Sequence, residues 1–206
     1  MEELVEGLKK AMFEDPVEDT RCVLHCEMKN EGFKTASKVQ YVARVGNFID
    51  NGADYTGALQ ILKVILSYDY LWQNIRVKGG AYGCMSGFSR TGEGYFVSYR
   101  DPNLERTMEV YEGIADYLRN FTVSDRDMNK YIIGTMSNID QPMTPSAKGD
   151  RSFNLYMNKV SAETIKKERL QILEAGQEDI RKLADVVEAV MKAEQVCVIG
   201  SEEKIE

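Results

Sequence analysis

An arginine and a tyrosine separated by five residues are the side chains whose types and spacing could support chemistry. Arg76 lies near the end of an expected helix, where a cation is electrostatically favoured, and Tyr82 begins the strand expected next. A tight turn at Gly79 and Gly80 would bring both side chains toward a common region. A guanidinium and a phenol hydroxyl placed together could bind a peptide carbonyl and stabilise the oxyanion that forms when water attacks it. The alternative, which the spacing alone favours, is a helix-capping arginine beside a half-buried strand tyrosine.

The glycine-rich stretch between these two residues has a second interpretation, a phosphate-binding loop. That interpretation is disfavoured because a phosphate loop follows a strand and opens a helix, whereas this stretch follows a helix and leads into a strand. Glycine at a strand more often marks a place where another backbone approaches closely, as an extended peptide does at a sheet edge. The residues expected to contact a peptide are Gly79, Gly80, Ala81 and Gly83.

A zinc site is suggested by the only histidine, His25, which lies in the run Cys22-Val-Leu-His25-Cys26. A tetrahedral site needs a second cluster of ligands, and the sequence holds none. On a strand, His25 and Cys26 would also point to opposite faces. A strand with two buried thiols is the better interpretation, and no metal is expected on this chain. Serine or cysteine nucleophilic catalysis is disfavoured as well, since His25 is the only available base.

The composition excludes other classes of protein. The formal net charge is -7 with both signs mixed along the chain, so no basic face for nucleic acid is expected. No apolar run approaches the ~20 residues of a membrane helix, and the N-terminal residues are neither a signal nor a transit peptide. Four scattered cysteines indicate reduced thiols, and a cytoplasmic location is expected.

Strand-like runs alternate with amphipathic helices along the chain. The expected strands cover residues 21–29, 38–46, 80–88, 94–99 and 196–199, the first ending in a turn at 30–32. The expected helices cover residues 54–72, a segment with Asp101 as N-cap and Pro102 at its first position, a segment capped by Ser124 with Asp127, and 150–159, 161–174 and 177–192. This pattern predicts an α+β fold with helices packed on a largely antiparallel sheet of about five to six strands. Residues 1–206 are expected to form a single domain.

The run IRVKGGAYG, preceded by a helix ending YLWQN and followed by GYFVSYRDPNL, resembles the C-terminal half of the pitrilysin/insulinase superfamily of zinc peptidases. Within that superfamily the sequence is most similar to the presequence-protease subfamily. The similarity covers most of the chain, from about Arg21 to Ile199. The Arg-x5-Tyr motif with its glycines and the stretch from Ser98 to Asn103 are its most specific parts.

The resemblance implies a function for the pair. Such enzymes consist of four related α+β domains in two halves that close around a chamber, where unfolded peptides are degraded. The first domain binds zinc through an H-x-x-E-H motif. The last domain contributes an arginine and a tyrosine, matching Arg76 and Tyr82, that grip the substrate backbone and stabilise the tetrahedral intermediate.

The sequence departs from the family in having no H-x-x-E-H motif. The resemblance therefore implies that zinc is bound by another domain, that the partner is the N-terminal zinc-bearing half of the same enzyme, and that this chain alone is inactive. We expect it to be the last domain of a larger peptidase, because its end at Glu206 looks cut short. The alternatives are a non-catalytic structural or partner subunit of an insulinase-like assembly, and a separate peptide-binding module.

Overall fold

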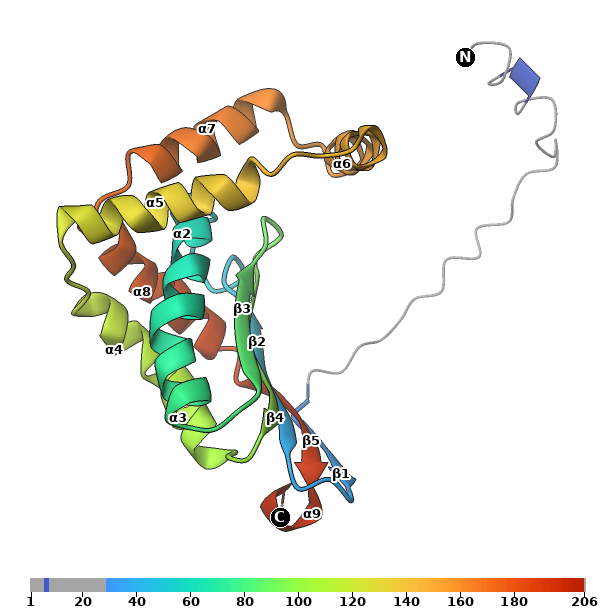
Figure 1. The fold of residues 1–206 in the computed structure, drawn as a ribbon. Coiled ribbons are helices and arrows are strands. Elements are labelled where there is room, and N and C mark those ends of the chain that lie inside the picture. The colour runs from blue at the N-terminus through green and yellow to red at the C-terminus, as the bar shows by residue number, and fades with distance from the viewer. Residues whose placement is uncertain (1–5, 8–28, 206) are drawn as a thin grey trace.

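Five strands form one mixed sheet in the computed structural model, which describes residues 6–7 and 29–205 (Figure 1). The strands are β1 (Glu31–Thr35), β2 (Gln40–Asn47), β3 (Gly83–Phe88), β4 (Glu93–Asp101) and β5 (Gln195–Ser201). Their order across the sheet is β1-β5-β2-β4-β3. Only the β1–β5 pairing is parallel, and the other three are antiparallel. The prediction of an α+β fold with a largely antiparallel sheet is confirmed.

Helices gather on one side of this sheet (Figure 1). They are α2 (Ala58–Ile65), η1 (Leu66–Tyr70), η2 (Trp72–Val77), α3 (Glu105–Glu112), α4 (Ile114–Arg119), α5 (Asp125–Ile139), α6 (Pro145–Met157), α7 (Ala162–Leu173), α8 (Gln177–Met191) and α9 (Glu202–Ile205). The segments η1 and η2 are π-helical and continue α2, so the predicted helix over residues 54–72 extends five residues further, to Val77.

The hydrophobic core lies between the sheet and these helices. Burial alternates along β2, so that Val42 points into the core while Tyr41 is exposed on the other face. From the helical side, α2 contributes Leu59 and Leu62 and α8 contributes Val187, all fully buried. The second face of the sheet carries partly exposed apolar side chains that no described helix covers: Tyr41, Met85, Tyr95 and Ile199. The sheet therefore presents one open, apolar face.

The prediction that Asp101 and Pro102 open a helix is wrong. Asp101 is the last residue of β4 and is fully buried, and α3 begins only at Glu105. Its carboxylate accepts hydrogen bonds from the backbone N–H of Asn103, at 2.9 Å, and from the hydroxyl of Thr107, at 2.7 Å. Asp101 thus holds the loop and the first turn of α3 from outside the helix, because an Asp side chain can bond to backbone two residues on as readily as it can cap.

Two smaller differences concern element ends. The expected turn at residues 30–32 is wrong, since β1 begins at Glu31 and pairs with β5. The helix expected at 150–159 begins at Pro145, because the Thr144 side chain accepts a hydrogen bond from the N–H of Ala147. The cap at Ser124 is confirmed, with its side chain accepting from the N–H of Asp127. The strand expected at 21–29 lies outside the described residues apart from Lys29.

Candidate functional site

Arg76 lies in the last turn of η2. The N–H of Lys78 donates to the carbonyl of Gln73, five residues back, at 3.0 Å, so the helix is widened where Arg76 leaves it. Single π-type turns of this kind are frequent at functional sites. The guanidinium carbon lies 4.0 Å from the ring centroid of Trp72, a cation–π contact that orients the side chain. Among the described residues no carboxylate pairs with Arg76, and the side chain is exposed.

The turn after Arg76 is a glycine cap that resembles a Schellman motif but is one residue wider, because the helix end before it is π-helical. The N–H of Gly80 donates to the carbonyl of Arg76 at 3.0 Å, and the N–H of Ala81 donates to the carbonyl of Ile75 at 3.1 Å. Gly80 has a φ of 79°, in the left-handed region that only glycine adopts without cost. Ala81 and Ile75 are both buried, so the hydrophobic contact typical of this cap anchors it to the core. The chain reverses direction at this cap. As a result β3 begins at Gly83, three residues later than the expected start at Gly80.

A second loop holds this cap in place. The side-chain amide of Asn103 donates to the carbonyl of Gly79 at 2.6 Å, and Asn103 is itself held by Asp101. At Gly79 a Cβ atom would lie 2.4 Å from the carbonyl oxygen of Ile75, so a larger residue does not fit. The chain segment after β4 therefore fixes the turn between Arg76 and Tyr82.

Tyr82 lies at the entrance to β3 with its ring exposed to solvent. Its N–H donates to the carbonyl of Arg100 at 3.3 Å, and 59% of the residue is exposed. The ring contacts that of Tyr99 at a centroid distance of 5.5 Å and the guanidinium of Arg100 at 5.4 Å. Tyr99 reaches it by lying across Gly83, where a Cβ atom would be 2.4 Å from the Tyr99 ring. The Tyr99 ring therefore covers Gly83 and also packs against the ring of Tyr82.

Arg100 is a residue that sequence reasoning missed. Its φ is 49°, a left-handed conformation that is uncommon for any residue other than glycine, and it places a second exposed cation beside Tyr82. Backbone strain of this kind clusters at functional sites. Arg100 lies in the stretch from Ser98 to Asn103 that resembles the presequence-protease subfamily, but no sequence signal marks an arginine with positive φ.

The charge of Arg76 extends to β3. Burial raises the pKa of the Cys84 thiol to about 11, and the positive charge of Arg76 opposes that rise. Cys84 lies in β3, two residues beyond Tyr82. That the Arg76 and Tyr82 side chains face a common region stays a prediction. The exposed Tyr82 phenol beside Arg100 can donate a hydrogen bond to a carbonyl or carboxylate oxygen.

An apolar hollow of about 410 Å³ adjoins this group on the open face of the sheet. It is lined by Tyr41, Val42, Ala43, Met85, Val97, Ser98, Tyr99, Cys197 and Ile199. Tyr99 belongs to the hollow and also contacts Tyr82, so the two features are continuous. The hollow suits apolar side chains.

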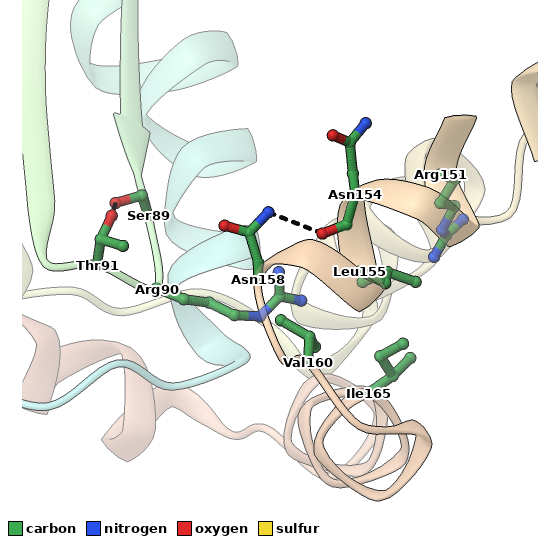
Figure 2. Close-up of a pocket in the computed structure, with 9 residues that line it drawn as sticks. All are labelled: Ser89, Arg90, Thr91, Arg151, Asn154, Leu155, Asn158, Val160 and Ile165. Carbon is green, nitrogen blue, oxygen red and sulfur yellow. Dashed lines mark hydrogen bonds between the residues drawn. The ribbon is translucent and has the colours of Figure 1, made fainter. Parts of the chain in front are cut away.

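A cavity of about 750 Å³ lies at the other end of the β3–β4 hairpin (Figure 2). Ser89, Arg90 and Thr91 from the hairpin tip line it, together with residues of α6 and α7. The Nε and Nη2 atoms of Arg90 donate hydrogen bonds to the carboxylate of Glu168, at 2.6 and 2.5 Å. The charge of Arg90 is therefore neutralised by this ion pair. Neither Arg76 nor Tyr82 lines this cavity.

No group of three or more histidine, cysteine, aspartate or glutamate residues that could hold a metal ion occurs in the part of the chain that the structure describes. Cys22, His25 and Cys26 lie outside that part. The described residues therefore do not fit a zinc site. Among them there is also no helix long and apolar enough to cross a membrane.

The fold is shared with peptidases. A peptidase M16 inactive domain from Pseudomonas fluorescens superposes with a TM-score of 0.62 at 15% identity, over 97% of this chain and 50% of that one. The described fold is therefore that of a peptidase M16 domain.

Sequence comparison identifies the family within the M16 peptidases to which the chain belongs. The family described as PreP C-terminal domain matches residues 30–203, and the chain belongs to that family. Protein HypA of Clostridium perfringens is 48% identical over 177 residues, which are 86% of this chain and 18% of that protein. Presequence protease 1, chloroplastic/mitochondrial, of Arabidopsis thaliana is 32% identical over 180 residues, 87% of this chain and 17% of that protein. The resemblance to presequence proteases is confirmed, and the chain spans less than a fifth of the length of these relatives.

Proposed function

We propose that this chain is the substrate-binding C-terminal domain of a longer peptidase that degrades unfolded peptides in a closed chamber. Arg76 and Tyr82 grip the substrate backbone and stabilise the tetrahedral intermediate of peptide hydrolysis. The proposal is supported by the glycine-capped turn, which has on its two sides an exposed phenol and a guanidinium that pairs with no carboxylate among the described residues. Since a structural arginine would be paired or buried, this arrangement favours a role toward a ligand.

The chemistry of the pair follows from its donors. The Arg76 guanidinium and the Tyr82 hydroxyl both donate hydrogen bonds, and a carbonyl oxygen accepts them more strongly as negative charge develops on it. Donors that are fixed beforehand cost no reorganisation during the reaction, and the cap and the Trp72 and Tyr99 contacts supply that fixation. Arg100 adds a positive charge beside the phenol.

The substrate is proposed to lie extended along β3. This strand is at the end of the sheet order, so its outer edge has no strand partner among the described residues. Exposed Gly80 presents no side chain, and Gly79, Ala81 and Gly83 keep the backbone narrow beside it. An extended peptide could add to such an edge, with apolar side chains entering the hollow next to Tyr99.

In this proposal the zinc of the peptidase is bound outside this chain, by the N-terminal half of the same enzyme, which is also the partner that closes the chamber. The isolated chain is then inactive, because it grips the substrate without supplying the metal. That residues 1–206 form a single domain, the last of the enzyme, is part of the same proposal. A cytoplasmic location stays a prediction from the sequence.

The test uses the full-length enzyme with Arg76→Ala. Removal of one fixed donor to an oxyanion lowers kcat by about 10²–10³-fold. Lys78→Ala, which removes an exposed cation two residues away, is the matched control and should leave kcat within about twofold. Zinc content and thermal unfolding are measured for both variants. A near-normal kcat in Arg76→Ala would contradict the proposed role of Arg76 in stabilising the intermediate.

A further inference from the structure

Helix α6 turns polar side chains toward the rest of its domain and apolar side chains away from it. Arg151, Asn154 and Leu155, spaced three and four residues apart, line the cavity toward the hairpin tip (Figure 2). Phe153 and Tyr156, three residues apart, lie on the opposite side of the helix. A surface helix normally turns its apolar side inward and its polar side to water. In α6 two of the three inward residues are polar, and the outward side carries the aromatic rings.

The outward side chains are strongly exposed in the described structure. Phe153 is 63% exposed, Tyr156 80% and Met157 60%. We call these three residues the α6 apolar face. None of the residues of α6 is buried, and no other described helix or strand packs closely against it (Figure 1).

Packing against the rest of the described residues therefore does not account for the stability of α6. A helix of 13 residues is marginal in water by itself, and most helices in proteins gain their stability from a packed apolar side. The Thr144 cap and Pro145 at the first position start the helix but supply only about 1 kcal/mol. The side available for packing is the α6 apolar face.

We infer that the α6 apolar face docks against another domain of the same full-length polypeptide, on an apolar surface of that domain. This inference rests on the proposed function, in which the chain is one domain of a longer peptidase. The relatives carry more than four-fifths of their length outside the region matched here, so ample chain exists to cover the face.

The area of the α6 apolar face favours a partner domain in the same polypeptide over a second copy of this protein. Three partly exposed large side chains offer roughly 400 Å² of apolar area. A stable interface between separate proteins buries about 800 Å² on each partner, so a dimer through this face would be weak. A contact within one polypeptide needs less area, because the linked domain is present at an effective concentration on the order of millimolar.

A substrate peptide is a poorer occupant. A peptide extended along β3 from Tyr82 would reach the hairpin tip, where α6 presents Arg151, Asn154 and Leu155 across the cavity. The α6 apolar face lies on the opposite side of the helix, away from that path.

The test is hydroxyl-radical footprinting of the wild-type full-length protein without substrate. Tyr156 is compared with Tyr68, a tyrosine of similar exposure (67%) on η1, and each rate is divided by its rate in the denatured protein. Docking predicts that Tyr156 is modified at least about threefold more slowly than Tyr68, at all protein concentrations, since a docked side chain is desolvated. Equal rates would overturn the inference. Protection that grows with protein concentration, or that needs added peptide, would also overturn it, in favour of a second copy or of substrate.

A variant pair sharpens the result. Tyr156→Lys should raise the modification of Phe153 and Met157 several-fold in the full-length protein, whereas Tyr68→Lys should leave both unchanged, because only the first substitution places a charge in the contact. Unchanged modification in Tyr156→Lys would count against docking. The kcat of Arg76→Ala, measured separately, reports on the proposed function, so failure of one inference is distinguishable from failure of the other.

Discussion

The two ends of the β3–β4 hairpin differ in how firmly their surroundings are held. At the Tyr82 end, a capped helix, a buried aspartate and two aromatic contacts fix the turn. At the tip, a cavity of about 750 Å³ separates the hairpin from α6, whose apolar face points outward. The domain is therefore held firmly where we propose that a substrate binds, and it exposes an apolar helix face where we infer that another domain packs.

The largest expected effect on this rigidity comes from Asp101→Ala. The substitution leaves the Asn103 N–H and the buried Thr107 hydroxyl without their acceptor, a loss of about 2–4 kcal/mol. Amides of the Gly79–Tyr82 turn should then exchange with solvent roughly 30- to 1000-fold faster, measured by native-state hydrogen exchange. Amides of α6 should not change. Equal acceleration at both ends of the hairpin would remove the contrast between them.

Gly80→Ala should have a smaller effect. A Cβ atom there would meet only Pro102, at 3.6 Å, so the loss comes from the positive φ and amounts to about 1–2 kcal/mol. The turn should open roughly 5- to 30-fold more often by the same exchange measurement. Gly134→Ala, in the interior of α5 with its nearest neighbour at 3.9 Å, is the control and should be stabilising by up to about 1 kcal/mol. Destabilisation of the same size in both variants would contradict the role given to Gly80.

The smallest expected effect is a change in the reactivity of the Cys84 thiol, which reports on the charge of Arg76. Burial raises the pKa of this thiol to about 11, so the fold disfavours the thiolate and stability is lost as pH rises above the ordinary thiol value toward 11. Because Arg76 opposes the rise, Arg76→Ala should raise the pKa of Cys84 further and slow its alkylation at pH 9–10 several-fold. An unchanged alkylation rate would place Arg76 away from β3.

Sequence patterns predicted the Arg76–Tyr82 turn because its geometry depends on glycines, whose types reveal a left-handed cap. They misplaced Asp101, since an Asp-Pro pair signals a helix start equally well when its carboxylate is buried outside the helix. Arg100 could not be predicted, because positive φ in an arginine is imposed by tertiary contacts. The outward direction of Phe153 and Tyr156 was equally hidden, since periodicity shows that a helix has an apolar side but not what that side faces.

The central claim is that Tyr82 acts on the substrate rather than on the fold, and kcat of the full-length enzyme with Tyr82→Phe tests it most directly. Phe keeps the ring that packs on Tyr99 and removes only the exposed hydroxyl. If the hydroxyl stabilises the intermediate, kcat should fall by about 10²–10³-fold while the melting temperature stays unchanged. A kcat within about twofold of wild type would contradict it, because the hydroxyl would then have no part in stabilising the intermediate.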